Sequence, residues 1–211
     1  MPRWEWRALG VRFGAAEEMF QPTGAPQTSD ELYLLSAAEV NVKIRGGLLD
    51  VKVLRETNAD GLERWEPVMK EGFPLAADDV VAVLGFLGVD ASALAREAYD
   101  EAQLRSEVID PAGGVRAVAV HKVRTRVTVG GCMAEIADVE AAGRSTRTIA
   151  IEGEDPVAVA VAVREVNLDG WRNTSYPHGL AALVDGEPAR YAVIDVGTNS
   201  VKFHLAERSD D

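Results

Sequence analysis

The sequence of 211 residues has a single cysteine, Cys132, and lacks the segments that mark membrane or secreted proteins. One cysteine excludes an internal disulfide, which fits a reducing compartment. The longest apolar runs, such as 157–163, are far too short to span a bilayer. The first residues lack the apolar core of a signal peptide. We therefore expect a cytoplasmic protein without a membrane partner, in which Cys132 is a small buried residue rather than a nucleophile.

Positive charge is also scarce, with 22 Lys and Arg against 34 Asp and Glu, and the net charge is -12. That balance argues against a general nucleic-acid binder. Aromatic residues make up 6% of the chain, and Trp65 and Trp171 stand outside any series that would stack bases. His121 and His178 have no visible metal-binding or catalytic partners. These absences leave a globular protein whose chemistry depends on other residue types.

Segments that alternate between apolar and polar residues, rich in β-branched side chains, predict about eight strands. Gly46-Gly47 and Gly130-Gly131 each stand between two such segments and predict two-residue hairpins. The predicted strands are Trp4–Phe13, Leu32–Ser36, Glu39–Arg45, Leu48–Arg55, Arg64–Lys70, Arg116–Val129, Cys132–Glu140 and Thr146–Glu152.

Helical spacing of alanine and leucine predicts helices over Ala76–Leu87 and Ala91–Ser106. Asp155-Pro156 has the residue types of an N-cap followed by proline at the first helical position, which predicts a third helix. A short helix is expected near Leu180, followed by a linker.

Charge follows one face of the first predicted hairpin. In 39–45 the odd positions are polar and the even positions are aliphatic, so the two kinds of side chain point to opposite faces. A turn at Gly46-Gly47 would place Lys43 opposite Asp50 and Asn41 opposite Lys52, which extends the same charged face.

The second hairpin repeats this design. Lys122, Arg124 and Arg126 share one face, and the ideal register places Glu135 opposite Arg126. Asp138 then falls on the other face unless a bulge intervenes.

Two interpretations of these charged faces stay open. Antiparallel sheets often have one solvated polar side, and the charges then need no ligand. Alternatively, the strands form a closed barrel with basic and acidic side chains inside. Basic groups neutralise phosphates, and carboxylates hold Mg²⁺, which bridges phosphate oxygens. The concentration of Lys and Arg on a few strands of an acidic chain favours the second interpretation.

From Trp4 to about Val166 the chain resembles the CYTH superfamily of triphosphate tunnel metalloenzymes. The resemblance is carried by Glu5-Trp6-Arg7, Lys43-Ile44-Arg45, Asp50-Val51-Lys52, Lys122-Val123-Arg124-Thr125-Arg126, the run 134–139, Gly143 and the run 148–152. It implies an eight-stranded antiparallel barrel whose tunnel binds triphosphate through Arg7, Lys43, Arg45, Lys52, Lys122, Arg124 and Arg126. It also implies that Mg²⁺ or Mn²⁺ is held by Glu5, Glu135, Asp138 and Glu152.

The chain departs from the pattern of that family at the start. The family opens with Glu-x-Glu-x-Lys, whereas this chain has Arg3 in place of the first carboxylate and Arg7 in place of the lysine. Ala150 also stands where a further glutamate is expected. Fewer carboxylates weaken the case for metal-dependent hydrolysis more than the case for phosphate binding.

The run 191–205 ends one strand at Asp195, turns at Gly197 and continues into a second strand. Thr198, Asn199 and Ser200 supply donors that suit an anion. The run resembles the opening of the exopolyphosphatase/guanosine pentaphosphate phosphohydrolase family, whose domains have the actin-like ATPase fold. The resemblance implies a phosphate loop made of Asp195, Gly197, Thr198, Asn199 and Ser200.

These observations predict an α+β protein. We expect a barrel over residues 1–184, a linker over 185–190, and over 191–211 a β-hairpin that begins an exopolyphosphatase domain continuing beyond this chain. The expected ligand is inorganic polyphosphate or triphosphate, with no nucleic-acid partner. The barrel either binds and hydrolyses phosphoanhydrides with a metal or binds them without catalysis, and the solvated interaction domain is the third alternative.

Overall fold

A computed structural model describes residues 1–20, 25–91, 94–186, 189–197 and 200–208, the last two ranges by their backbone alone. Its main feature is a closed antiparallel barrel of eight strands, in the order β1-β10-β9-β8-β2-β3-β4-β5. The strands are β1 (Arg3–Gly10), β2 (Gln27–Leu35), β3 (Val40–Arg45), β4 (Leu48–Thr57), β5 (Glu63–Gly72), β8 (Arg116–Val129), β9 (Cys132–Ala141) and β10 (Arg144–Gly153). The predicted eight-stranded barrel is thus confirmed.

The two glycine pairs form the predicted hairpins. All four glycines have positive φ, between 55° and 81°, as the turn between two twisted strands requires. The predicted registers are also confirmed. Lys43 lies opposite Asp50, Asn41 opposite Lys52, and Arg126 opposite Glu135.

Barrel closure depends on β1, which pairs with β10 on one side and with β5 on the other. Because side chains alternate along each strand, the charged side chains point into the closed barrel and the apolar side chains of the same strands point outward. The outward apolar residues would be exposed if nothing covered them, and the helices cover them.

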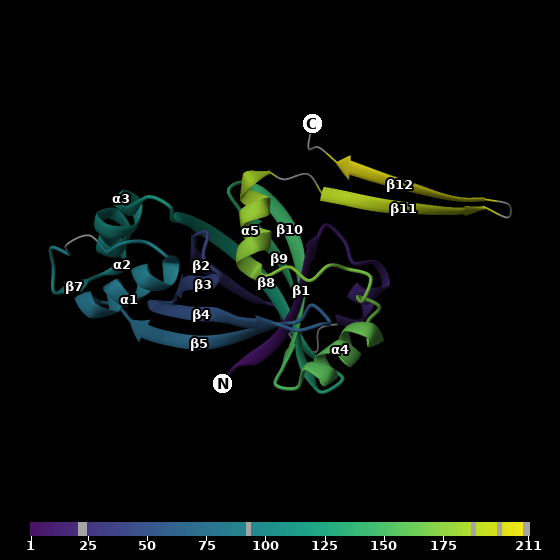
Figure 1. Cartoon of the computed structure of the whole chain (residues 1–211), viewed down its shortest axis with the longest axis horizontal. Coiled ribbons are helices and arrows are strands. Elements are labelled where there is room, and N and C mark those ends of the chain that lie inside the picture. Colours follow the sequence, from purple (N-terminus) through teal and green to yellow (C-terminus); the bar gives the residue numbers. More distant parts are fainter. Residues whose placement is uncertain (21–24, 92–93, 187–188, 198–199, 209–211) are drawn as a thin grey trace.

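Two groups of helices cover the outside of the barrel (Figure 1). Helix α4 (Pro156–Glu165) packs Val159 and Ala162 on the outer face of β1, β9 and β10, together with the 3-10 helix η1 (Gly14–Phe20). Asp155 accepts a hydrogen bond from the backbone N–H of Val157, which confirms the predicted N-cap.

The second group follows β5 and packs on the outer face of β3 and β4. It contains a small sheet of β6 (Leu75–Ala76) and β7 (Ala98–Tyr99), together with α1 (Ala77–Leu87), α2 (Glu101–Gln103), the π-helix η2 (Leu104–Ile109) and α3 (Asp110–Ala112). The predicted helix Ala76–Leu87 is confirmed.

The predicted helix over Ala91–Ser106 begins later than expected. The Tyr99 hydroxyl accepts hydrogen bonds from the backbone of Ala95 and Arg96, which holds that segment in a turn. Asp100 and Gln103 then form a capping box, so helical structure begins at Glu101. Alanine content alone overestimated the helix at its start.

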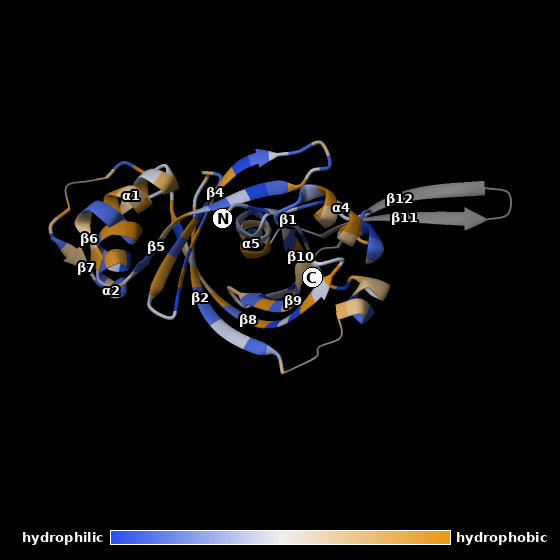
Figure 2. Cartoon of the chain, turned by 90° about the horizontal axis from the view of Figure 1, so that it is seen from below, coloured by the Kyte–Doolittle hydropathy of each residue, from blue (hydrophilic) through white to orange (hydrophobic). Residues whose placement is uncertain are grey.

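Helix α5 (Tyr176–Asp185) lies within the ring of strands when the barrel is viewed end-on (Figure 2). Tyr176 and Leu180 pack among Leu35, Val118 and Val139, which point inward from β2, β8 and β9. This part of the barrel interior is therefore apolar, and Tyr33 and Tyr176 mark where it meets a cavity lined by charged side chains.

The C-terminal residues form a separate two-stranded sheet of β11 (Ala189–Gly197) and β12 (Ser200–Arg208). Asp195 lies opposite Lys202 in its backbone register. The expected hairpin is present, but Thr198 and Asn199 of the predicted phosphate loop lie outside the described residues. None of the described helices is long and apolar enough to cross a membrane.

Candidate functional site

The inward-facing charged side chains line one cavity of about 330 Å³, called the charged cavity below. All seven predicted phosphate-binding residues line it, from four different strands. They are Arg7 on β1, Lys43 and Arg45 on β3, Lys52 on β4, and Lys122, Arg124 and Arg126 on β8. The alternative of a solvated charged sheet is wrong for these residues, because barrel closure brings them together inside.

Three of the four predicted carboxylates also line the charged cavity, namely Glu5, Glu135 and Glu152. Asp138 does not. It lies opposite Val123 without a bulge, so its side chain points outward, where it accepts a hydrogen bond of 2.7 Å from Arg147. Its predicted role as a ligand in the cavity is wrong. Asp138 is three positions from Glu135 on the same strand, and because side chains alternate, this odd spacing puts the two on opposite faces.

The charge balance of the cavity is opposite to that of the chain. Including Lys70 and Asp50, which also line it, the cavity has eight basic and four acidic side chains. That is a formal excess of four positive charges within a protein whose net charge is -12. Such a concentration of one sign inside low-dielectric walls raises the local concentration of anions.

Glu135 is the most heavily paired carboxylate in the cavity. Its carboxylate oxygens lie 2.9 Å from Lys122 Nζ, 3.5 Å from Arg126 Nε and 3.7 Å from Arg124 Nη1. Burial alone would raise the pKa of Glu135, but these cations and Arg7 overcome burial and hold that pKa at about 2. Glu135 is therefore an anion at all physiological pH values.

Arg7 connects the acidic and aromatic parts of the cavity. Its Nε donates to Glu5 at 2.8 Å, and its Nη1 donates to the Thr148 hydroxyl at 3.1 Å. Its guanidinium lies 5.0 Å from the centre of the Tyr176 ring, and Lys122 Nζ lies 4.8 Å from the same ring. Burial opposes the charge of Arg7, but Glu5 and Glu135 raise its pKa above the ordinary arginine value. Two cations thus lie about 5 Å from the centre of the same aromatic ring.

Glu31 on β2 was not predicted from the sequence. In the structure its side chain is fully buried. It lies within 3.8 Å of Lys43 and 3.3 Å of Arg45, and it accepts hydrogen bonds from Ser29 and Tyr33. Burial raises its pKa, but Lys43 and these donors lower it overall. The predicted strand began at Leu32, so the alternation of residues 29, 31 and 33 was cut off.

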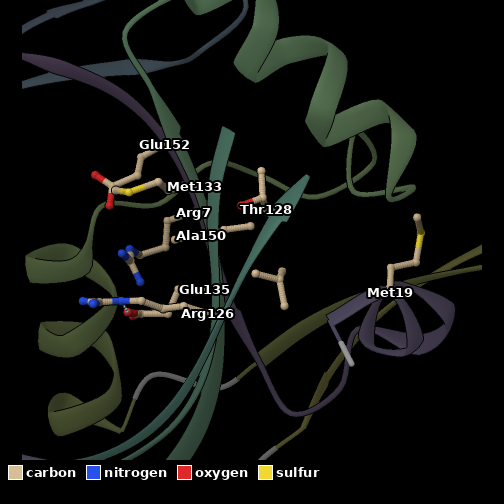
Figure 3. A pocket seen from close by; sticks show the side chains of 10 residues that line it. Arg7, Met19, Arg126, Thr128, Met133, Glu135, Ala150 and Glu152 are labelled. Atoms are coloured by element: carbon tan, nitrogen blue, oxygen red, sulfur yellow. Dashed lines mark hydrogen bonds and ion pairs between the residues drawn. The ribbon is translucent and has the colours of Figure 1, made fainter. Parts of the chain in front are cut away.

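Tyr176 was missed for a different reason. It comes from α5, and its ring stacks on Tyr33 with centroids 4.8 Å apart. Nothing in the sequence around Tyr176 points to the barrel interior, since only packing places α5 there. Figure 3 shows the neighbouring hollow, in which Arg7, Arg126 and Glu135 lie together on one side of the strands, whereas Met19 lies on the other.

Three residues that line the charged cavity each have one buried polar atom without a hydrogen-bond partner among the described residues. These atoms are Asn41 Oδ1, Arg124 Nε and the Tyr176 hydroxyl. An unpartnered buried polar group costs about 1–3 kcal/mol, so such groups usually meet water or a ligand. Asn41 and Arg124 therefore have an unused acceptor and an unused donor beside the cavity.

The same cavity does not fit a divalent cation held by the protein. Such an ion needs several free oxygen ligands, but Glu5 and Glu135 are each bound to a cation within 3 Å. Among the described residues, no three His, Cys, Asp or Glu side chains gather as a metal-ligating group. The expected Mg²⁺ or Mn²⁺ is not matched by the donor set as arranged.

Comparison with known proteins gives fold neighbours only. No protein-family model matches the sequence, and the search of curated proteins found no match. Solved structures of similar fold include an adenylate cyclase candidate from Bacillus halodurans, with a TM-score of 0.45, 10% identity, and coverage of 82% of this chain and 94% of that one.

Two further neighbours cover similar lengths. An adenylyl cyclase candidate from Hippeastrum, described as having a dominant triphosphatase activity, has a TM-score of 0.45 and 15% identity, with 88% of this chain and 96% of that one covered. A conserved protein from Pyrococcus furiosus has a TM-score of 0.46 and 14% identity, with 83% and 98% covered. The relation of residues 191–211 to the exopolyphosphatase family stays a prediction.

Proposed function

We propose that the barrel binds triphosphate or short inorganic polyphosphate in the charged cavity. The observation that carries this proposal is the convergence of eight basic side chains inside a barrel that belongs to an acidic protein. Lys and Arg in such numbers suit the many oxygens of a polyphosphate, which they neutralise by charge-assisted hydrogen bonds.

The size of the cavity favours a small anion. Its volume of about 330 Å³ lies within the range of about 300–1,000 Å³ that is typical of small-molecule sites, and it adjoins the hollow of Figure 3, which shares Arg7, Arg126 and Glu135. Six of the eight cations are buried or half-buried inside the barrel, where a nucleic-acid duplex cannot reach them, whereas Arg126 and Lys70 are more than half exposed. The resemblance of residues 191–205 to the opening of a polyphosphate-handling family is a second reason to choose polyphosphate.

Binding is better supported than hydrolysis. A general base works best with a pKa near the working pH, but Glu135 has a pKa of about 2 and the pKa of Glu5 is also lowered. Both carboxylates stay ionised and paired, so neither is poised to take a proton from water. The function that the cavity supports best is therefore recognition of the anion without turnover.

Titration calorimetry with tripolyphosphate at low salt tests the proposal directly. We expect a dissociation constant on the order of micromolar, weakening as salt screens the charges, and much weaker binding of orthophosphate. Phosphate release in the same samples, with and without Mg²⁺ or Mn²⁺, should stay at the uncatalysed level. Absence of tripolyphosphate binding at low salt would refute the proposal, and rapid release would replace binding with hydrolysis.

Lys43 should make this binding sensitive to alkaline pH. Burial, together with repulsion from Arg45, Lys122 and Lys52, lowers its pKa to about 8 despite the opposing attraction of Glu31. Lys43 is then charged at pH 7 and neutral above about pH 9, so affinity should fall across that interval by about tenfold. Lys43→Met should bind more weakly at pH 7 and lose this part of the pH profile. Parallel profiles for the two proteins would contradict the assignment.

A further inference from the structure

Every inward-facing carboxylate predicted to hold a metal is already paired with a cation of the protein. Glu5 lies 2.8 Å from Arg7, Glu135 lies 2.9 Å from Lys122, and Glu152 lies 3.6 Å from Arg3 at the rim. In the first two pairs the side chains are nearly buried, with exposures between 5% and 15%. In the ligand-free protein these carboxylates therefore form ion pairs with basic side chains of the protein.

On the basis of the proposed function, we infer that Glu5 and Glu135 are internal counter-ions of an anion site, and that this site takes polyphosphate without a protein-held divalent cation. A buried cation without a counter-charge is strongly destabilising. Glu135 supplies that counter-charge to Lys122 and Arg124, whose exposures are only 5% and 11%. The carboxylates keep the basic cluster folded and oriented while the cavity is free of ligand.

The surroundings of Glu135 lack further ligands for a divalent cation, and their positive charges would repel it. Lys122, Arg124 and Arg126 all lie within 3.7 Å of its oxygens, and Arg7 is close enough to lower its pKa. A divalent cation bound to Glu135 would face four positive charges at short range. A phosphate anion at the same place would meet four attractive partners.

This arrangement makes the bound anion and the carboxylates competitors for the same cations. Phosphate oxygens that approach Lys122 and Arg7 must share or replace the contacts made by Glu135 and Glu5. Removing a carboxylate therefore removes a competitor and raises the affinity for polyphosphate. If the carboxylates held a metal that bridges to phosphate, removing one would lower that affinity, so the two roles predict opposite signs.

The test measures tripolyphosphate binding by Glu135→Gln and wild-type protein, in EDTA and in excess Mg²⁺. We expect the variant to bind about tenfold more tightly than wild type in both buffers. Asp138→Asn is the matched control, because it removes the same charge from the same strand on the outer face, and it should stay within about twofold of wild type. The inference would be overturned if Glu135→Gln bound tripolyphosphate more weakly than wild type, or equally well, in EDTA. It would also be overturned if the variant lost affinity only in the buffer with Mg²⁺.

Two further measurements keep the inference testable if Glu135→Gln does not fold. Glu5→Gln frees Arg7 in the same way and should also strengthen binding. Titration of wild-type protein with Mn²⁺ alone, followed by electron paramagnetic resonance, should show no saturable site in the barrel. A saturable Mn²⁺ site that Glu5→Gln removes would overturn the inference. If wild-type protein bound tripolyphosphate neither in EDTA nor in excess Mg²⁺, that result would instead refute the proposed function.

Discussion

Replacing Arg124 by methionine is expected to weaken tripolyphosphate binding about a hundredfold. Its guanidinium lines the charged cavity, only 11% of its side chain is exposed, and its Nε has no hydrogen-bond partner among the described residues. A buried charged donor in a binding site contributes about 2–5 kcal/mol when its partner is present. Methionine keeps most of the volume of the side chain but none of its donors.

Calorimetry on Arg124→Met and on Arg55→Met shows whether the loss of affinity comes from the cavity itself or from the change in net charge. Arg55 is on the outside of the barrel, about half exposed, and paired with Glu66. Its loss removes the same charge and should change affinity by no more than about threefold. The fold of Arg124→Met should persist, because Lys122 and Arg126 still neutralise Glu135. Equal effects of the two substitutions would mean that the cavity is not the binding site.

Glu31→Ala is expected to lower the free energy of unfolding by about 3–5 kcal/mol, among the largest effects of any single substitution in the barrel. The side chain of Glu31 is fully buried, and the substitution would leave Lys43 and Arg45 without their counter-charge. It would also remove the acceptor of the Tyr33 hydroxyl, which is itself buried. The melting temperature should fall by roughly 10 °C for a chain of this length.

Urea denaturation at pH 7 measures this effect, with Glu66→Ala on the exposed outer pair as the control. The control should change stability by less than about 1 kcal/mol. Glu31→Gln should lie between the two. Ser29 and Tyr33 donate to different oxygens of Glu31, so the single amide oxygen of Gln can accept only one of these hydrogen bonds, and it carries no charge. A cost of Glu31→Ala below about 1 kcal/mol would show that Glu31 does not hold the basic cluster together.

Short-range features of the barrel were predictable because they depend on local backbone rules. The Gly46-Gly47 and Gly130-Gly131 turns set the register of their hairpins, and those registers placed Lys43 opposite Asp50 and Arg126 opposite Glu135. Asp138 was assigned to the site from family resemblance, against the parity of its own strand. The alternation rule was correct there and the resemblance was not.

The features that were missed depend on long-range packing. Glu31 was missed because the ends of a predicted strand are uncertain by a few residues. The predicted strand began at Leu32, one residue too late to include Glu31. Tyr176 enters the barrel only because α5 packs against inward-facing side chains of β2, β8 and β9. No pattern around Tyr176 indicates which surface its helix will cover.

The sequence by itself determined which side chains share a face, because a strand alternates strictly and a two-residue turn fixes the pairing of its neighbours. It therefore determined that Lys and Arg gather on common faces of β3 and β8. Only the tertiary structure decided that these faces point inward and meet. That outcome depends on β1 pairing with both β5 and β10, which closes the barrel, and on the helices that cover its apolar outer face. The same closure pairs Glu152 of β10 with Arg3 of β1, because it brings these two strands together.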